Sequence, residues 1–244
     1  MLSTLLIALF GVFAASVLRG FTGFGFGLAA VPLLSLALPP AQVVPFVVVL
    51  QVLVGLGGIR PAWKLCDWRA MRGLVPGLLL GIPMGTLVLT AFAPNTVRLV
   101  IGAIIAASVL LLWRGAKLPP RPSMALTMGV GTLSGIISGL ASMGGPPVVV
   151  YLLALGHGAA VVRATSIVYF MATGLTATVA MVPRGLIDLH VVLWSVAAIP
   201  VLLGGSALGT WGFHRAKPHH HRVTALVVLS VLSVVLIARA LLDR

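Results

Sequence analysis

The sequence predicts an all-α integral membrane protein made of two homologous halves. Of the 244 residues, 60% are hydrophobic and 8% are charged, whereas soluble domains carry roughly 25% charged residues. Long apolar runs fill the chain, and no polar stretch between them is long enough to form a soluble domain. Two further observations, an internal repeat and a glycine-rich interruption near the start of each half, set the expected architecture.

The internal repeat consists of identical residues that recur after one constant shift, without a gap. The shift carries residue 76 to residue 200, and it superposes Pro76, Gly81, Gly85, Thr86, Pro94 and Arg98 on Pro200, Gly205, Gly209, Thr210, Pro218 and Arg222. This duplication predicts a first transmembrane repeat over residues 1–115 and a second over residues 124–244, within a single membrane domain.

Each half contains five apolar runs. In the first half the runs are 2–18, 26–38, 41–59, 73–92 and 97–113. Those of the second half are 124–138, 145–156, 160–182, 189–213 and 223–242. A membrane-spanning helix needs about 20 residues, and the two runs 26–38 and 145–156 are too short for a full crossing. We therefore expect about eight full transmembrane helices and two short broken or re-entrant helices.

The positive charges distinguish two topologies. If all runs cross, each half has an odd number of elements, the halves are inverted, and the 16 Lys and Arg residues divide 12 to 4. If the short runs dip in and return, the halves are parallel and the division is 10 to 6. Cytoplasmic loops carry the excess of positive charge, which favours inverted repeats with both termini outside. The larger charge difference of the inverted topology depends on Arg19 and Arg163, which belong either to loops or to a binding site.

The glycine-rich interruptions, here called the first break (residues 20–27) and the second break (residues 139–147), predict a binding site. Glycine permits unusual backbone angles, and Pro146 and Pro147 suit the first turn of a helix. Each break should end one helix and begin a short one, whose N-terminal N–H groups point into a cavity and attract an anion. Thr22 and Ser142 would add hydroxyl donors. Close packing between helices is the alternative explanation for these glycines.

The shortage of acidic residues also favours an anionic substrate. The chain has no Glu, and its acids are Asp67, Asp188 and Asp243, all outside the apolar runs. Ion-coupled transporters usually place a carboxylate inside the membrane. The sequence therefore predicts an uncoupled anion transporter with Arg19 and Arg163 beside the breaks. An inside-negative potential drives an anion outward with about 2.3 kcal/mol per charge per 100 mV, which favours export.

Several segments of both halves resemble the TauE/SafE sulfite-exporter family. In the first half these are residues 20–27, 31–34 and 67–69. The similar segments of the second half are 144–147, 150–152 and 163–165. The resemblance covers nearly the whole chain, and it implies a multi-pass transporter of the bacterial inner membrane. The implied substrates are sulfur-containing anions such as sulfite, sulfoacetate or other organosulfonates, and Thr165 joins the candidate residues.

The candidate substrate-binding residues lie in or beside the breaks, match the family pattern, or are polar side chains inside apolar runs. For Gln51 and Tyr169, which belong to the last group, a structural tie between helices is an equal alternative. The complete set is Arg19, Thr22, Gly23, Gly25, Gln51, Ser142, Met143, Gly144, Gly145, Arg163, Thr165 and Tyr169.

Other functions find less support. Two alternatives to a transporter are an intramembrane enzyme and a non-transporting membrane assembly subunit. Without Glu the HExxH motif is excluded, and His157 with Ser166 is the nearest approach to a base and nucleophile, so no enzyme activity is expected. The single Cys66 excludes an intrachain disulfide and a CxxC site. We expect no metal, cofactor or nucleic acid. The partners are the small anion and the lipid bilayer, and a homo-oligomer stays open.

Overall fold

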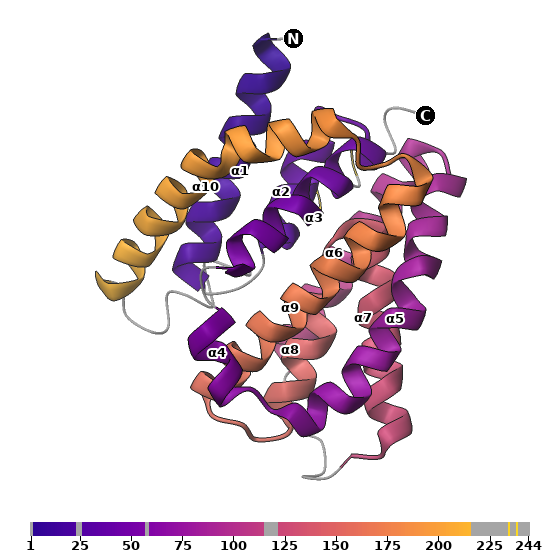
Figure 1. The fold of residues 1–244 in the computed structure, drawn as a ribbon, viewed down its shortest axis with the longest axis vertical. Coiled ribbons are helices and arrows are strands. Elements are labelled where there is room, and N and C mark those ends of the chain that lie inside the picture. The colour runs from indigo at the N-terminus through magenta and orange to yellow at the C-terminus, as the bar shows by residue number, and fades with distance from the viewer. Residues whose placement is uncertain are drawn as a thin grey trace.

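The computed structural model describes residues 2–22, 26–56, 59–114 and 122–215, together with residues 234 and 238. All regular structure in this part is helical (Figure 1), which confirms the all-α prediction for the described residues. The helices are α1 (Leu2–Thr22), α2 (Phe26–Ser35), α3 (Pro40–Leu56), α4 (Ile59–Leu65), α5 (Trp68–Ala91), α6 (Pro94–Arg114), α7 (Met124–Ala141), α8 (Gly145–Ala154), α9 (Ala159–Met181), the 3-10 helix η1 (Val182–Arg184) and α10 (Leu189–Arg215).

Four of the described helices are long and apolar enough to cross a membrane, namely α5, α7, α9 and α10. A fifth span results if α3 and α4 count together, but the two are bent by 75°. The apolar run 41–59 corresponds largely to α3, and the bend follows near the end of that run. The expected total of about eight spans stays a prediction, and most of the last apolar run, 223–242, lies outside the described residues.

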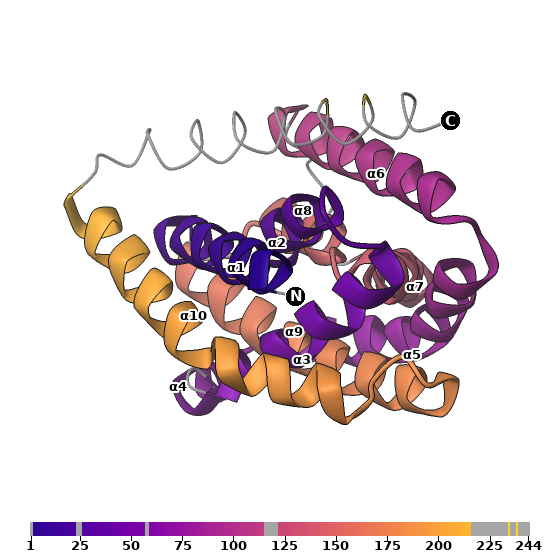
Figure 2. The same ribbon diagram turned by 90° about the horizontal axis from the view of Figure 1, so that it is seen from above.

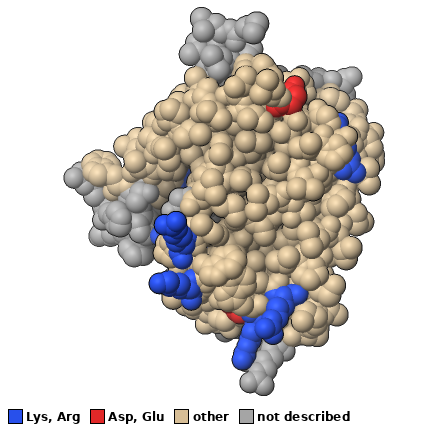
Figure 3. Space-filling view, viewed as in Figure 1, with Lys and Arg blue, Asp and Glu red and all other residues tan. Residues whose placement is uncertain are grey.

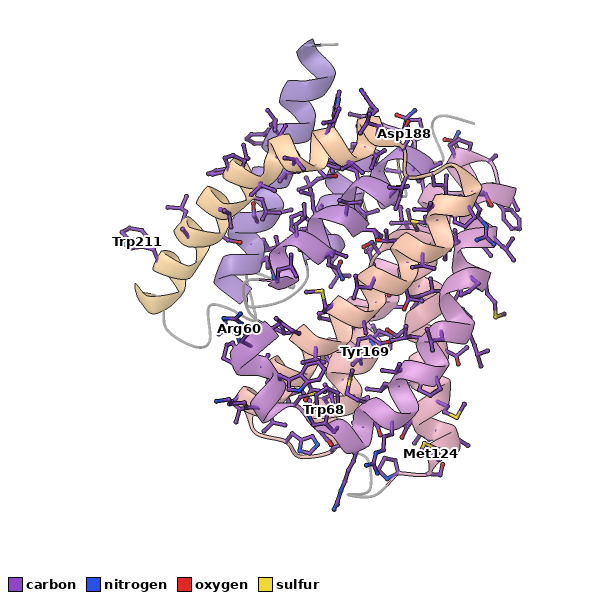
Figure 4. All side chains as sticks on the ribbon, viewed as in Figure 1. Arg60, Trp68, Met124, Tyr169, Asp188 and Trp211 are labelled. Atoms are coloured by element: carbon purple, nitrogen blue, oxygen red, sulfur yellow. The ribbon has the colours of Figure 1, made fainter. Side chains whose placement is uncertain are left out.

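The surface of these helices suits a lipid environment. On α5, Leu79, Leu80 and Leu87 are more than half exposed, and on α10 Leu193 and Leu203 are likewise exposed. Large apolar side chains gathered on a surface mark contact with lipid or another protein. Four exposed cations, Arg60, Lys64, Arg69 and Arg72, belong to α4 and the first turns of α5, and most of the blue surface in Figure 3 lies in the lower half of the view. Asp188 lies at the opposite end (Figures 3 and 4).

The helices α5 and α7 pack with their backbones in direct contact. A Cβ atom added at Gly77, Gly81 or Gly85 of α5 would overlap the backbone of α7. Small residues at every fourth position let membrane helices approach this closely. A Cβ atom added at Gly131, Gly135 or Gly139 of α7 would likewise overlap the backbone of α5. Close packing therefore explains Gly139 of the second break.

The second extensive helix pair joins α1 to α10. Here Gly205 of α10 meets the carbonyl of Phe13 and the hydroxyl of Ser16 on α1. Gly205 is the residue that the sequence repeat pairs with Gly81. Both glycines thus lie at a close helix contact, one with α7 and the other with α1.

Two helices are interrupted where the sequence predicts it. The helix α1 ends at Thr22 and α2 begins at Phe26, while α7 ends at Ala141 and α8 begins at Gly145. Pro146 and Pro147 occupy the first turn of α8, as expected. Nearly every residue of α2 and α8 is buried, and both lie towards the inside of the bundle, with α6 on one side and α9 and α10 on the other (Figure 2).

The first helices of the two predicted halves run in opposite directions. From the N-terminus α1 descends in Figure 1, whereas α7 ascends from Met124 at the lower end of Figure 4. Two of the long helices, α5 and α10, begin at an aspartate. Asp67 caps α5 by accepting from the N–H groups of Arg69 and Ala70, and Asp188 accepts from the N–H of Val191 at 2.8 Å. These caps explain why α5 starts before its apolar run.

Candidate functional site

The two breaks, which lie more than a hundred residues apart in the chain, meet in the structure. Gly27, in the first turn of α2, lies against the carbonyl oxygen of Ser142 in the second break, and an added Cβ atom would overlap that oxygen. Glycine at position 27 is therefore required by a close approach of backbone to backbone. The predicted meeting of the breaks is present for the residues that the structure describes.

Ser142 has an unusual backbone conformation. It caps the C-terminus of α7 with φ 54° and ψ 28°, and its N–H donates to the carbonyl of Ser138 at 2.7 Å. A left-handed conformation is uncommon for a residue other than glycine, and strain of this kind costs about 1–3 kcal/mol and gathers at functional sites. The Ser142 hydroxyl donates to Oε1 of Gln51 on α3 at 3.2 Å, which leaves the NH₂ group of that amide to donate elsewhere.

A cavity of about 60 Å³ lies where the breaks meet. A water-sized group needs roughly 15 Å³, so the cavity has room for about four such groups. It is bordered by α1, α2, α3, α9 and the second break. The residues of α9 that line it lie near the middle of that helix. Six predicted site residues line it: Arg19, Gln51, Ser142, Met143, Gly144 and Gly145.

Positive charge dominates around this cavity. Arg19, in the last turn of α1, lines it. Arg163, on α9, is exposed but lies close enough to Arg19 for the two guanidinium groups to repel each other. Among the described residues, those that line the cavity include no Asp or Glu. Gly145 begins α8, so its N–H group and the positive dipole end of that helix also lie at the cavity, while Pro146 and Pro147 of the first turn have no N–H group to donate.

Ser166 is a lining residue that the set of candidate binding residues lacks. It is 6% exposed, and its hydroxyl has no hydrogen-bond partner among the described residues. Residues three or four positions apart share one face of a helix, and Ser166 and Phe170 of α9 line the cavity together. Ser166 lies three positions after the predicted site residue Arg163, and this spacing is the sequence signal that could have pointed to it.

Three other predicted residues lie outside the set that lines the cavity. Thr165 is fully buried, and its hydroxyl oxygen accepts from the N–H of Asp67 at 2.9 Å. Tyr169 is fully buried, and its hydroxyl lies beside Ser134 without a hydrogen bond. Arg163 is exposed and is not among the lining residues, so the role expected for it stays a prediction. Gly23 and Gly25 lie outside the described residues, as does the side chain of Thr22, so the roles expected for them stay predictions.

His157 is engaged away from the cavity. Its Nε2 lies 2.7 Å from Oδ2 of Asp67, so its partner is a carboxylate and not the hydroxyl of Ser166. Within the described ranges, no three His, Cys, Asp or Glu side chains form a cluster suited to a metal ion.

A larger hollow of about 550 Å³ opens at the other end of the molecule, between residues 38–46 and residues 185–194. Asp188, His190 and Trp194 line it together with Gln42, and the His190 and Trp194 rings lie 4.9 Å apart. None of the predicted site residues borders this hollow.

The fold and the cavity point to a class of protein, since broken helices that end at a shared cavity inside a helical membrane protein are typical of transporters. The profile of the family Sulfite exporter TauE/SafE matches residues 7–236, so the chain belongs to this family, whose members are transporters and not enzymes. The chain is also 29% identical over 208 residues to the Probable sulfite/organosulfonate exporter TauE of Cupriavidus necator, which covers 80% of this chain and 79% of that relative. No solved structure matches.

Family membership confirms three expectations. The resemblance stated from the paired motifs is correct, the protein is a membrane transporter, and the intramembrane enzyme and the non-transporting subunit are set aside. Family membership also implies an anionic substrate and a membrane setting.

Proposed function

We propose that the protein exports a small sulfur oxyanion, either sulfite or an organosulfonate such as sulfoacetate, across the bacterial inner membrane. The anion binds in the cavity between the two breaks. The observation that carries this proposal is the cavity lining, in which Arg19 and the N-terminus of α8 meet without any acidic residue. The name of the Cupriavidus necator relative supports the same class of substrate.

The cavity suits the head group that sulfite and organosulfonates share. A volume of about 60 Å³ accommodates a sulfur atom with three oxygens, and an organic tail would extend beyond it. Arg19 supplies the charge, and the amide of Gln51 supplies a neutral donor oriented by Ser142. Guanidinium groups recognise planar pairs of anionic oxygens through two parallel hydrogen bonds.

We further propose that residues 1–115 and 124–244 are inverted repeats. The opposite directions of α1 and α7 support this arrangement. The helix contacts support it too. The first helix of each half packs on a helix of the other half, α1 on α10 and α7 on α5, and the sequence repeat pairs α5 with α10. The exposed cations of α4 and α5 then lie at the cytoplasmic end, and the N-terminus lies outside.

Export follows from the sign of the substrate. An inside-negative membrane potential favours outward movement of an anion by about 2.3 kcal/mol per charge per 100 mV. The acids of the chain that the structure describes, Asp67 and Asp188, both cap helix ends and neither lines the cavity. The transport step therefore uses the potential and needs no coupled proton or sodium ion.

Anion flux in proteoliposomes tests the proposal. The purified protein is reconstituted in vesicles loaded with sulfite, sulfoacetate or sulfate, the potential is clamped with potassium and valinomycin, and no proton or sodium gradient is present. We expect sulfite or sulfoacetate flux that rises with the potential and is absent from protein-free vesicles. Flux that requires a proton gradient would overturn the uncoupled mechanism. No flux of any sulfur anion under either condition would overturn the proposed substrate class.

A further inference from the structure

Three buried hydroxyl groups have no hydrogen-bond partner within the part of the chain that the structure describes. They belong to Ser35, Ser166 and Tyr169. Ser35 lies in α2, while Ser166 and Tyr169 lie one turn apart on α9. Of the three, only Ser166 lines the cavity between the breaks. A buried polar group without a partner is rare in native proteins, and each case calls for a physical explanation.

The missing partner of Ser166 is unusual even for this protein. A helical Ser or Thr commonly donates to the carbonyl four residues earlier. Eight hydroxyls of the described helices do so, those of Ser16, Thr86, Thr90, Thr127, Thr132, Thr173, Thr178 and Ser195. Ser166 has the corresponding carbonyl, that of Val162, in its own helix and does not use it. Its hydroxyl is therefore available to a ligand at the cavity.

Other groups of the cavity are already engaged. The Ser142 hydroxyl donates to Gln51, and the carbonyl oxygen of Gly144 accepts from the Ser134 hydroxyl. Ser166 is fully buried at its oxygen, and a rotation about its χ1 angle between staggered positions aims the hydroxyl at different neighbours. A hydroxyl that donates to an anion forms a shorter and stronger hydrogen bond than one that donates to a neutral acceptor.

We propose that Ser166 is a substrate-contacting residue that donates its hydroxyl hydrogen to an oxygen of the bound oxyanion. This inference rests on the proposed function and identifies a further residue of its site. The ligand class is an anion with several acceptor oxygens, of which one pairs with Arg19 and another accepts from Ser166. Arg19 on α1 and Ser166 on α9 then hold the anion between elements of the two predicted halves.

The test compares Ser166→Ala with Ser35→Ala. Both substitutions remove a buried hydroxyl without a partner, and Ser35 does not line the cavity. In proteoliposomes we expect Ser166→Ala to raise the half-saturating sulfite concentration by about tenfold, because a hydrogen bond to a charged group is lost, with a smaller change in the maximal rate. Ser35→Ala should leave both values unchanged. Ser166→Thr, which keeps the hydroxyl, should restore much of the sulfite affinity.

Thermal unfolding in detergent gives a second measurement. Without ligand, Ser166→Ala should unfold at the same temperature as wild type or higher, because removing an unsatisfied hydroxyl relieves a penalty. Addition of sulfite should raise the unfolding temperature of wild type and Ser35→Ala more than that of Ser166→Ala. Equal half-saturation of Ser166→Ala and wild type would overturn the role of Ser166 and leave the transporter proposal intact. Absence of sulfur-anion flux in the wild type would overturn the proposed function itself.

Discussion

Nε2 of His157 lies 2.7 Å from Oδ2 of Asp67, and this contact joins the loop before α9 to the first turn of α5. Asp67 uses all its polar groups here. Its Oδ1 accepts from Arg69 and Ala70, and its own N–H donates to the hydroxyl of Thr165. Asp67 thereby attaches the loop between α4 and α5 to α9 through Thr165 and to the loop before α9 through His157.

Substitutions at Asp67 should separate its two roles. Asp67→Asn keeps an oxygen that caps α5 equally well and removes the charge next to His157. We expect a loss of about 1 kcal/mol in the free energy of unfolding, because the pair is partly exposed and such pairs contribute at most about 1 kcal/mol. Asp67→Ala should lose about 1 kcal/mol more with the cap. Denaturant unfolding in detergent measures both losses, and equal losses for the two variants would show that the cap is not needed.

The glycines of α5 should not tolerate a side chain. An added Cβ at Gly81 or Gly85 meets the backbone of α7, which cannot rotate away as a side chain does. We expect Gly81→Ala to lower the free energy of unfolding by about 1–3 kcal/mol through overpacking. Gly129→Ala is the matched control, because nothing lies within 4 Å of its added Cβ and Ala favours a helix by up to about 1 kcal/mol. Gly81→Ala as stable as Gly129→Ala would contradict the backbone contact between α5 and α7.

The two arginines beside the cavity should differ in their effect on transport. Arg19→Gln removes a lining charge, and we expect the half-saturating sulfite concentration to rise roughly ten- to hundredfold. Arg163→Gln should raise it by about fivefold or less, since an exposed charge acts weakly through solvent. Arg184→Gln is the control, because Arg184 donates to the carbonyl of Ala180 at the far end of α9. Flux measurements at fixed potential compare the three variants, and an unchanged Arg19→Gln would remove Arg19 from the site.

The Cys66 thiol should react slowly at neutral pH. Burial raises the pKa of Cys66 above its ordinary value of 9.0, the Asp67 carboxylate raises it further, and a hydrogen bond with Thr165 lowers it. The thiolate is the reactive form, so maleimide labelling of the folded protein should lag behind that of the denatured protein at about pH 7.5 and accelerate above about pH 9. Because the folded pKa is raised, the stability linked to this thiol is full below about pH 9 and is lost as the pH rises through the folded value.

Mass spectrometry of the labelled peptide measures this difference. Asp67→Asn removes the nearby carboxylate, so its Cys66 should label faster than that of the wild type at the same pH. Labelling of the folded wild type at the rate of the denatured chain would contradict the burial of the thiol.

The ends of the broken helices could be predicted from the sequence because they depend on local chemistry. Pro146 and Pro147 suit the first turn of a helix, where their missing N–H groups cost nothing, and the glycines before them leave the backbone free to turn. The meeting of Gly27 with Ser142 could be proposed only because two similar breaks occur in matching places. The bend between α3 and α4 was missed, since the apolar run 41–59 continues across it.

Only part of the lining of the cavity could be predicted from the sequence. Polarity and position select Gln51 and Arg19, and both line the cavity. Thr165 and Ser166 are neighbours in sequence, but successive helical residues point about 100° apart, so Thr165 holds the Asp67 loop and Ser166 faces the cavity. The significance of Ser166 lies in a hydrogen bond that it does not make, and only a three-dimensional structure reveals such an absence.

The backbone contact between α5 and α7 limits how the molecule can change shape. A layer of side chains can repack during motion, whereas interlocked backbones either stay together or separate completely. We therefore expect the α5–α7 pair to move as one rigid body, and Gly205 gives α1 and α10 a similar close contact. Each of these bodies takes one helix from each predicted half. We expect a carrier cycle that keeps both contacts to move these mixed pairs relative to each other, and not one half of the chain relative to the other.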